Sequence, residues 1–140
     1  MNEIEKTKSI FDSIKHIDEL GNEYWYAREL QMVLDYTQWR RFESVINKAK
    51  ITCDNSDVDI NRHFANVGKM LINVNGGERK INEYKLSRYA CYLIAQNADP
   101  RKEAIALAKT YFAIQTRKQE ILESDYNLLS EDEKRLYQRS

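Results

Sequence analysis

The sequence predicts an α+β fold that is mostly helical, with a helix-turn-helix-like corner, a β-hairpin around residues 68–85 and two long C-terminal helices. Three observations lead to this prediction. Apolar residues recur at helical spacing over much of the chain. Asn75, Gly76 and Gly77 separate two strand-like runs and tolerate the positive φ that a hairpin turn requires. The only proline, Pro100, directly follows an aspartate, as is typical of a helix start.

The first part of the chain is predicted to contain a short amphipathic helix and a short strand. Ile10, Phe11 and Ile14 follow helical spacing, which predicts a helix over residues 5–17. The aromatic run EYWYA at 23–27 is typical of a β-strand, because aromatic side chains favour pleated, half-buried positions.

Two further helices are predicted to form the helix-turn-helix-like corner. One spans residues 27–34, and the other spans residues 38–50, where apolar side chains form one stripe. Thr37 is expected to cap the second of these helices. Residues 52–62 are polar and are predicted to form a loop that ends in a short helix near His63.

The segment KLSRYACYLIAQNADPRK is predicted to hold one whole helix and the start of the next. Ser87 is expected to cap the first helix, over residues 88–96, and Asn97 is expected to end it in a left-handed conformation. Asp99 is expected to cap the second helix, with Pro100 at its first position, and no breaker follows before about residue 124.

We expect one folded domain over residues 1–124, followed by the start of a further helical segment over residues 125–140. Ser130 and Glu133 have the spacing of a capping box, but the helix that they would begin has little chain left to it. This pattern favours a chain truncated from a longer protein.

The composition is that of a folded domain in a reducing compartment. The 140 residues are 42% hydrophobic and 31% charged, which argues against a disordered chain, and no apolar run is long enough to cross a bilayer. Only two cysteines occur, Cys53 and Cys91, which argues against a disulfide scaffold. We therefore expect a cytoplasmic protein with no membrane partner.

The formal net charge of zero conceals a strong segregation of charge along the chain. Residues 1–23 and residues 119–140 each carry −3, whereas residues 38–50 carry +3 and residues 61–118 carry +7. A basic middle between acidic ends favours a surface that faces a polyanion. Ordinary solvated helix faces would produce the same counts, and this alternative stays open at the level of sequence.

Catalytic and metal-binding sites find little support in the sequence. A nucleophile needs a base within hydrogen-bond reach, and neither His16 nor His63 lies in a strand-turn-helix elbow. Ser87 is expected to be a helix cap, and Cys91 is expected to be a packed core residue. The acidic loop at 54–59 lacks the glycine and the terminal glutamate of a calcium loop. We therefore expect no enzymatic activity, no metal and no cofactor, and a metal-dependent nuclease is the weakest of the alternatives.

Basic and polar side chains in three places are candidates for binding nucleic acid. Helix 38–50 presents them on one face and at its exposed start, the part of a recognition helix that reaches base edges. Two more follow the hairpin tip, and three lie where the last two helices begin, so we expect them all to converge on one basic surface. The candidates are Gln38, Arg40, Arg41, Ser44, Lys48, Arg79, Lys80, Arg88, Arg101 and Lys102.

Four stretches carry a family resemblance. YWYARELQMVLDY, WRRFESVINKAK, YKLSRYACYLIAQNADPRKE and ALAKTYFAIQTRKQE closely resemble the DNA-damage-inducible protein D family of bacteria, from about Phe11 to Arg139. More distantly, WYARELQMVLDY and LSRYACYLI are similar to motifs of the Bro N-terminal domain, which occurs in phage antirepressors and viral DNA-binding proteins. The chain departs from the Bro pattern at Glu29, where aspartate is usual, and at Asp35, where glycine is usual.

The resemblance implies a small domain that is induced with the SOS response and binds nucleic acid or proteins acting on it. It implies a RecA-type recombinase filament on single-stranded DNA as a partner, and no enzymatic activity. Whether the DNA is single- or double-stranded, and whether the chain forms a homodimer, is left open. The main alternative is an antirepressor-like protein-interaction module that does not itself contact DNA.

Overall fold

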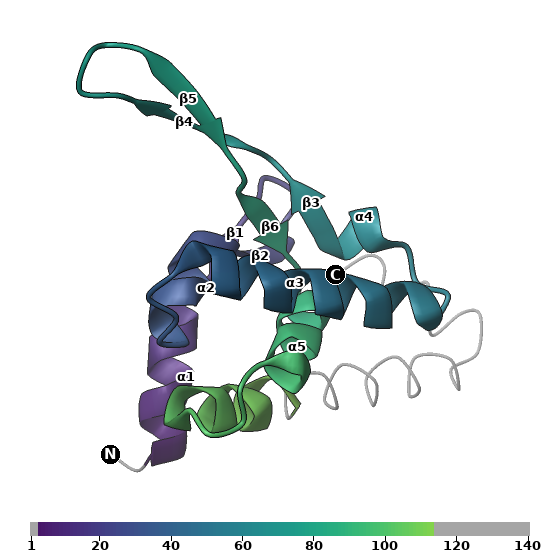
Figure 1. The fold of residues 1–140 in the computed structure, drawn as a ribbon. Helices are drawn as coiled ribbons and strands as arrows, with labels where there is room; N and C mark the ends of the chain where they lie inside the picture. The colour runs from purple at the N-terminus through teal and green to yellow at the C-terminus, as the bar shows by residue number, and fades with distance from the viewer. Residues whose placement is uncertain (1–2, 114–140) are drawn as a thin grey trace.

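The computed structural model describes residues 3–113, and it confirms an α+β fold that is mostly helical (Figure 1). The helices are α1 (Glu3–Ser13), α2 (Ala27–Val33), α3 (Trp39–Asn55), α4 (Ile60–His63), α5 (Arg88–Asn97) and a last helix whose described part is 103–113. The strands are β1 (His16–Ile17), β2 (Glu23–Tyr26), β3 (Phe64–Asn66), β4 (Lys69–Ile72), β5 (Glu78–Ile81) and β6 (Tyr84–Leu86). An antiparallel sheet has the strand order β1-β2-β6-β3, and β4 pairs with β5 alone.

One face of the four-stranded sheet belongs to the core, and the other face is partly exposed. Trp25, Leu86 and Phe64 are aligned across β2, β6 and β3, and all three are buried. Lys85 and Ala65 lie next to them and point to the opposite face, because side chains alternate along a strand. This second face is therefore partly exposed to solvent.

Helix α5 joins the sheet to the rest of the core. It packs against α3 and against β2 and β6, and Ile94 on α5 is fully buried, as are Phe42 and Ile46 on α3. Helix α1 enters the core through Phe11, whose ring stacks on Tyr111 at a centroid distance of 5.1 Å. Five of the ten residues of α5 are buried, so most of the helix surface is covered by these neighbours.

The corner between α2 and α3 is present, but its cap differs from the prediction. Asp35 adopts a φ of 63° in the turn, and the Gln31 side chain donates to the carbonyl of Tyr36 at 2.9 Å. The expectation that Thr37 caps α3 is wrong, because the N-cap is Gln38, which makes no side-chain cap hydrogen bond. Burial of the apolar stripe, rather than a cap, therefore holds the start of α3.

Two helix boundaries differ from the prediction. Helix α1 ends at Ser13 instead of residue 17, because His16 and the residue after it pair with β2. Helix α3 continues to Asn55 instead of ending at residue 50, because the fully buried Cys53 extends its apolar stripe. The predicted loop at 52–62 is correspondingly shorter.

The predicted hairpin is present, but its second run divides into two strands. Strands β4 and β5 form an arm, residues 69–81, that projects from the body (Figure 1). Gly76 has a φ of +86° at the tip, which a side chain would disfavour. Asn82 and Glu83 separate β5 from β6, so that β6 joins the larger sheet.

The cap of α5 is confirmed, but the end of α5 and the start of the next helix are not as predicted. Ser87 Oγ accepts a hydrogen bond from the Ala90 N–H at 3.1 Å. The left-handed Asn97 is wrong: positive φ is absent there, and its side chain instead donates to the Leu93 carbonyl at 2.8 Å. Residues 99–102 form a turn and the helix begins at 103, because the Asp99 carboxylate holds the backbone N–H of the second residue after it. The continuation to residue 124 and the segment 125–140 lie outside the described residues.

Candidate nucleic-acid interface

The exposed side of α3 carries five of the predicted site residues. Gln38 is the N-cap, and Arg40, Arg41, Ser44 and Lys48 are exposed along the helix. At roughly 100° per residue, Arg40 and Ser44 point away from the core. Arg41 and Lys48 lie together on one flank of the helix. Within the described part of the chain, none of these three cations forms an ion pair or a side-chain hydrogen bond. Their charges are therefore free to meet phosphate.

The arm presents its two predicted cations on opposite faces. Arg79 and Lys80 are consecutive in β5, and consecutive side chains of a strand point to opposite sides. The pairing register places Lys69 on the face of Arg79, whereas Glu78 shares the face of Lys80. One face of the arm therefore has two cations and no acid, and the other face has one of each.

A chain of contacts fixes the base of the arm against α2 and α3. The Asn82 side-chain amide donates to Glu43 Oε2 at 2.7 Å, and the backbone carbonyl of Asn82 accepts from Arg28 Nε at 2.9 Å. The Arg28 guanidinium also lies 4.0 Å from the centre of the Trp39 ring. The buried carboxylate of Glu83 accepts from the Arg28 backbone N–H at 3.1 Å. The arm thus leaves the body beside the first turns of α3, on the flank next to Arg40.

The remaining three predicted cations already have partners. Arg88 forms an ion pair with Glu23. Arg101 binds both oxygens of Asp99, at 3.0 and 3.1 Å, and these hydrogen bonds lower the pKa of that carboxyl to about 2. Lys102 Nζ donates to the carbonyl of the α2–α3 turn at 2.9 Å. These residues stay predicted contacts, but α3 and the arm supply the freer charges.

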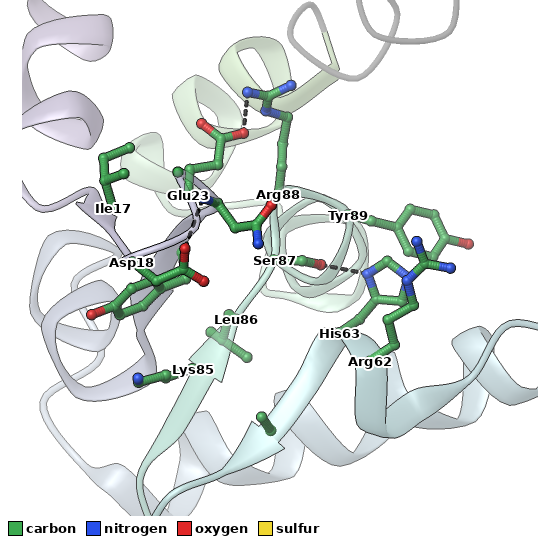
Figure 2. A pocket seen from close by; sticks show the side chains of 14 residues that line it. Ile17, Asp18, Glu23, Arg62, His63, Lys85, Leu86, Ser87, Arg88 and Tyr89 are labelled. Atoms are coloured by element: carbon green, nitrogen blue, oxygen red, sulfur yellow. Dashed lines mark hydrogen bonds and ion pairs between the residues drawn. The ribbon is translucent and has the colours of Figure 1, made fainter. Parts of the chain in front are cut away.

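A second feature, which the sequence did not predict, is a depression of about 890 Å³ on the exposed face of the sheet (Figure 2). We call it the sheet depression. Its lining residues come from β1, β2 and the turn between them, and from α4, β3, β6 and the start of α5. They are Ile17, Asp18, Gly21, Asn22, Glu23, Tyr24, Arg62, His63, Ala65, Lys85, Leu86, Ser87, Arg88 and Tyr89.

A histidine and a serine meet inside the sheet depression. His63 Nδ1 lies 2.6 Å from Ser87 Oγ, and the same oxygen accepts the Ala90 N–H that caps α5. Ser87 Oγ accepts the capping hydrogen bond through a lone pair. Its hydroxyl proton therefore remains available for a hydrogen bond to His63 Nδ1. Among residues 3–113 no third group orients His63 as an aspartate does in a hydrolytic triad. The contact links the end of α4 to the start of α5.

Partial burial lowers the pKa of His63, and the nearby Arg62 lowers it further. The unfolded chain then binds the proton more readily than the folded chain as the pH falls through about 6.5. Folding is therefore favoured above that pH, and this contribution is lost as the pH falls toward the lower pKa of the folded state.

We expect a His63→Gln variant to lose less free energy of unfolding than the unaltered chain between pH 7.5 and 5.5. The glutamine cannot take up a proton, so only the other groups of the chain contribute to its pH dependence. Urea denaturation of both proteins at the two pH values measures the difference. An equal loss in both proteins would show that His63 does not titrate in this way.

Both cysteines are free thiols and both are buried. Cys91 is 1% exposed, which confirms its predicted core position, and burial raises the pKa of its thiol well above the usual value. Residues 3–113 contain no group of three His, Cys, Asp or Glu side chains placed to hold a metal ion. No helix in this range is long and apolar enough to cross a membrane.

The combination of fold and sequence defines a known class of domain. The N-terminal domain of the BRO family matches residues 13–113, and the chain belongs to this family. Over 131 residues it is 44% identical to DNA damage-inducible protein D of Escherichia coli (strain K12). That match covers 93% of this chain and 48% of the relative, so the chain spans about half of the relative's length. No solved structure matches the chain. Both resemblances predicted from the sequence are confirmed.

Proposed function

We propose that this domain binds DNA through the exposed side of α3 and the arm, as a non-catalytic part of a cytoplasmic response to DNA damage. The observation that carries the proposal is the hydrogen bond from Asn82 to Glu43, which joins the base of the arm to the flank of α3 next to the exposed Arg40. Membership of the BRO family supports DNA as the ligand, and the name of the similar Escherichia coli protein supports the link to damage.

The salt dependence of binding tests this proposal. Each neutralised phosphate contributes about −0.9 to the slope of log affinity against log salt for a duplex, and about −0.7 for a single strand. Three cations on α3 and two on one face of the arm therefore predict a slope of about −4.5 or about −3.5. Fluorescence anisotropy with labelled oligonucleotides measures both slopes. Association that does not depend on salt would contradict the proposal.

The two faces of the arm lead to a prediction of unequal effects. We expect Arg79→Ala to weaken DNA binding more than Lys80→Ala, because Lys69 reinforces the first cation and Glu78 offsets the second. Loss of one phosphate contact lowers the salt slope by about 1. Parallel titrations of the two variants measure the difference, and a larger effect of Lys80→Ala would assign the contact to the other face.

We further propose a RecA-type recombinase filament on single-stranded DNA as the assembly that the domain modulates, as the family resemblance implies. One observation favours the alternative of a protein-interaction module: the arm exposes the apolar side chains of Met70, Ile72 and Val74. A pull-down of the recombinase from nuclease-treated samples separates the two. Capture without nucleic acid supports the interaction module, and capture only with single-stranded DNA supports a DNA-bound complex.

A further inference from the structure

The sheet depression is separate from the proposed DNA-binding surface and has the dimensions of a ligand site. Its volume of about 890 Å³ lies within the range of roughly 300–1,000 Å³ that is usual for small-molecule sites. Small residues keep it open, since Gly21 and Ala65 both line it. Figure 2 shows Arg62 and Lys85 at opposite sides, with Leu86 and Ser87 between them.

Two cations in the sheet depression form no ion pair within the described residues. The Arg62 side chain forms no hydrogen bond or ion pair with residues 3–113. Lys85 Nζ lies 4.7 Å from the centre of the Tyr24 ring, and this cation–π contact keeps the ammonium group beside the wall of the depression. Two separated cations of this kind attract an anionic ligand.

The two carboxylates of the sheet depression are already engaged. Glu23 is held by the ion pair with Arg88 and by a longer contact of 3.8 Å with Lys15. Asp18 accepts the backbone N–H groups of Leu20 and Asn22, each at 2.9 Å, within its own turn. These acids therefore offset Arg62 and Lys85 only in part.

An aromatic wall stands beside one of the cations. The rings of Tyr89 and His63 meet at a centroid distance of 5.1 Å and an angle of 64°, and Arg62 lies next to them (Figure 2). Base stacking on aromatic side chains and phosphate contacts to nearby cations are the two elements by which proteins hold single nucleotides of a strand.

We propose that the sheet depression binds one nucleotide, with its base against Tyr89 and His63 beside Arg62 and its phosphate at Lys85 on the opposite side. The proposal rests on the proposed function for the class of ligand, but it uses a different surface. A free nucleotide and a nucleotide unit of a single strand present the same chemistry to this site.

Heteronuclear NMR titration of the whole chain with dAMP, a short single-stranded oligonucleotide and inorganic phosphate tests the proposal. We expect dAMP to shift the amide signals of 62–65 and 85–89 and to bind at least about tenfold more tightly than inorganic phosphate, because phosphate cannot stack. The oligonucleotide shifting the same amides identifies the strand as the source, and shifts from dAMP alone identify the free nucleotide. Absence of shifts at these amides with both nucleotide probes overturns the proposal.

Matched variants separate this site from the α3 surface. Arg62→Ala/Lys85→Ala removes the cations, and Ala65→Phe fills the depression without changing a charge, so each is expected to lower dAMP affinity at least about tenfold. The control Lys8→Ala/Lys109→Ala is expected to keep the dAMP affinity. The duplex DNA affinity of the same variants is measured in parallel, and lowered dAMP affinity with retained duplex affinity is the expected result. Unchanged dAMP affinity in the variants would contradict only the nucleotide site, and an unaltered chain that binds dAMP but not duplex DNA would contradict only the DNA-binding surface.

Discussion

The Trp25→Ala variant is expected to lose about 3–5 kcal/mol of the free energy of unfolding, which is a large part of the stability of a typical domain. Trp25 is fully buried at the centre of the sheet's core face. Its indole N–H donates to the Phe11 carbonyl at 3.0 Å, and its ring meets Phe112 edge to face at 5.5 Å. The residue thus links β2 to α1 and to the last described helix. Urea denaturation followed by circular dichroism measures the loss.

A Trp25→Phe variant is the matched control for this prediction. It keeps most of the buried apolar surface but removes the indole donor, which leaves the Phe11 carbonyl without that partner. We expect it to lose about 1–3 kcal/mol, less than the alanine variant. A loss below about 1 kcal/mol for Trp25→Ala would show that the three elements do not meet at this residue.

The Arg40→Ala/Arg41→Ala variant is expected to bind DNA about 10–100-fold more weakly at 0.1 M salt, with a salt slope reduced by about 2. The two arginines lie in the first turn of α3, are exposed and form no ion pair within the described residues. Their replacement therefore removes two phosphate contacts without breaking an interaction inside the domain. Mobility-shift titrations at several salt concentrations measure both quantities.

The control for this variant is Lys8→Ala/Lys109→Ala, which changes the net charge equally. These lysines belong to α1 and to the helix at 103–113, which lie at the end of the molecule opposite the arm (Figure 1). We expect the control to keep its DNA affinity within about threefold, because only distant, screened charges are lost. Equal weakening of both variants would indicate a general charge effect instead of a binding surface on α3.

Local signals in the sequence predicted several elements correctly. The serine before an apolar helical run gave the cap at Ser87, and Asn-Gly-Gly gave the tip of the arm. The helical spacing of the apolar residues in α3 predicted which side of the helix is exposed, and Arg40 and Ser44 lie on that side. In each case, residues that are close to one another in the sequence determine the local structure.

Contacts between distant residues decided what the sequence did not predict. Arg88 is paired by Glu23, which lies far from it in sequence, and this partner could not be recognised from spacing. His63 and Ser87 meet only because β6 lies between β2 and β3 in the sheet, and the same strand order creates the sheet depression. The end of α3 was missed because the burial of Cys53 depends on its packing partners and not on the polar residues around it.

Photo-crosslinking from the centre of the α3 surface tests the central claim most directly. The chain has two cysteines, Cys53 and Cys91, and both are buried, so a Ser44→Cys variant can be labelled at one exposed position with a thiol-reactive photo-crosslinker. A Lys8→Cys variant on α1 serves as the control. We predict that labelled Ser44→Cys protein crosslinks to a DNA oligonucleotide and that labelled Lys8→Cys protein does not. Crosslinking from position 8 with none from position 44 would contradict the assignment of α3 as the surface that contacts DNA.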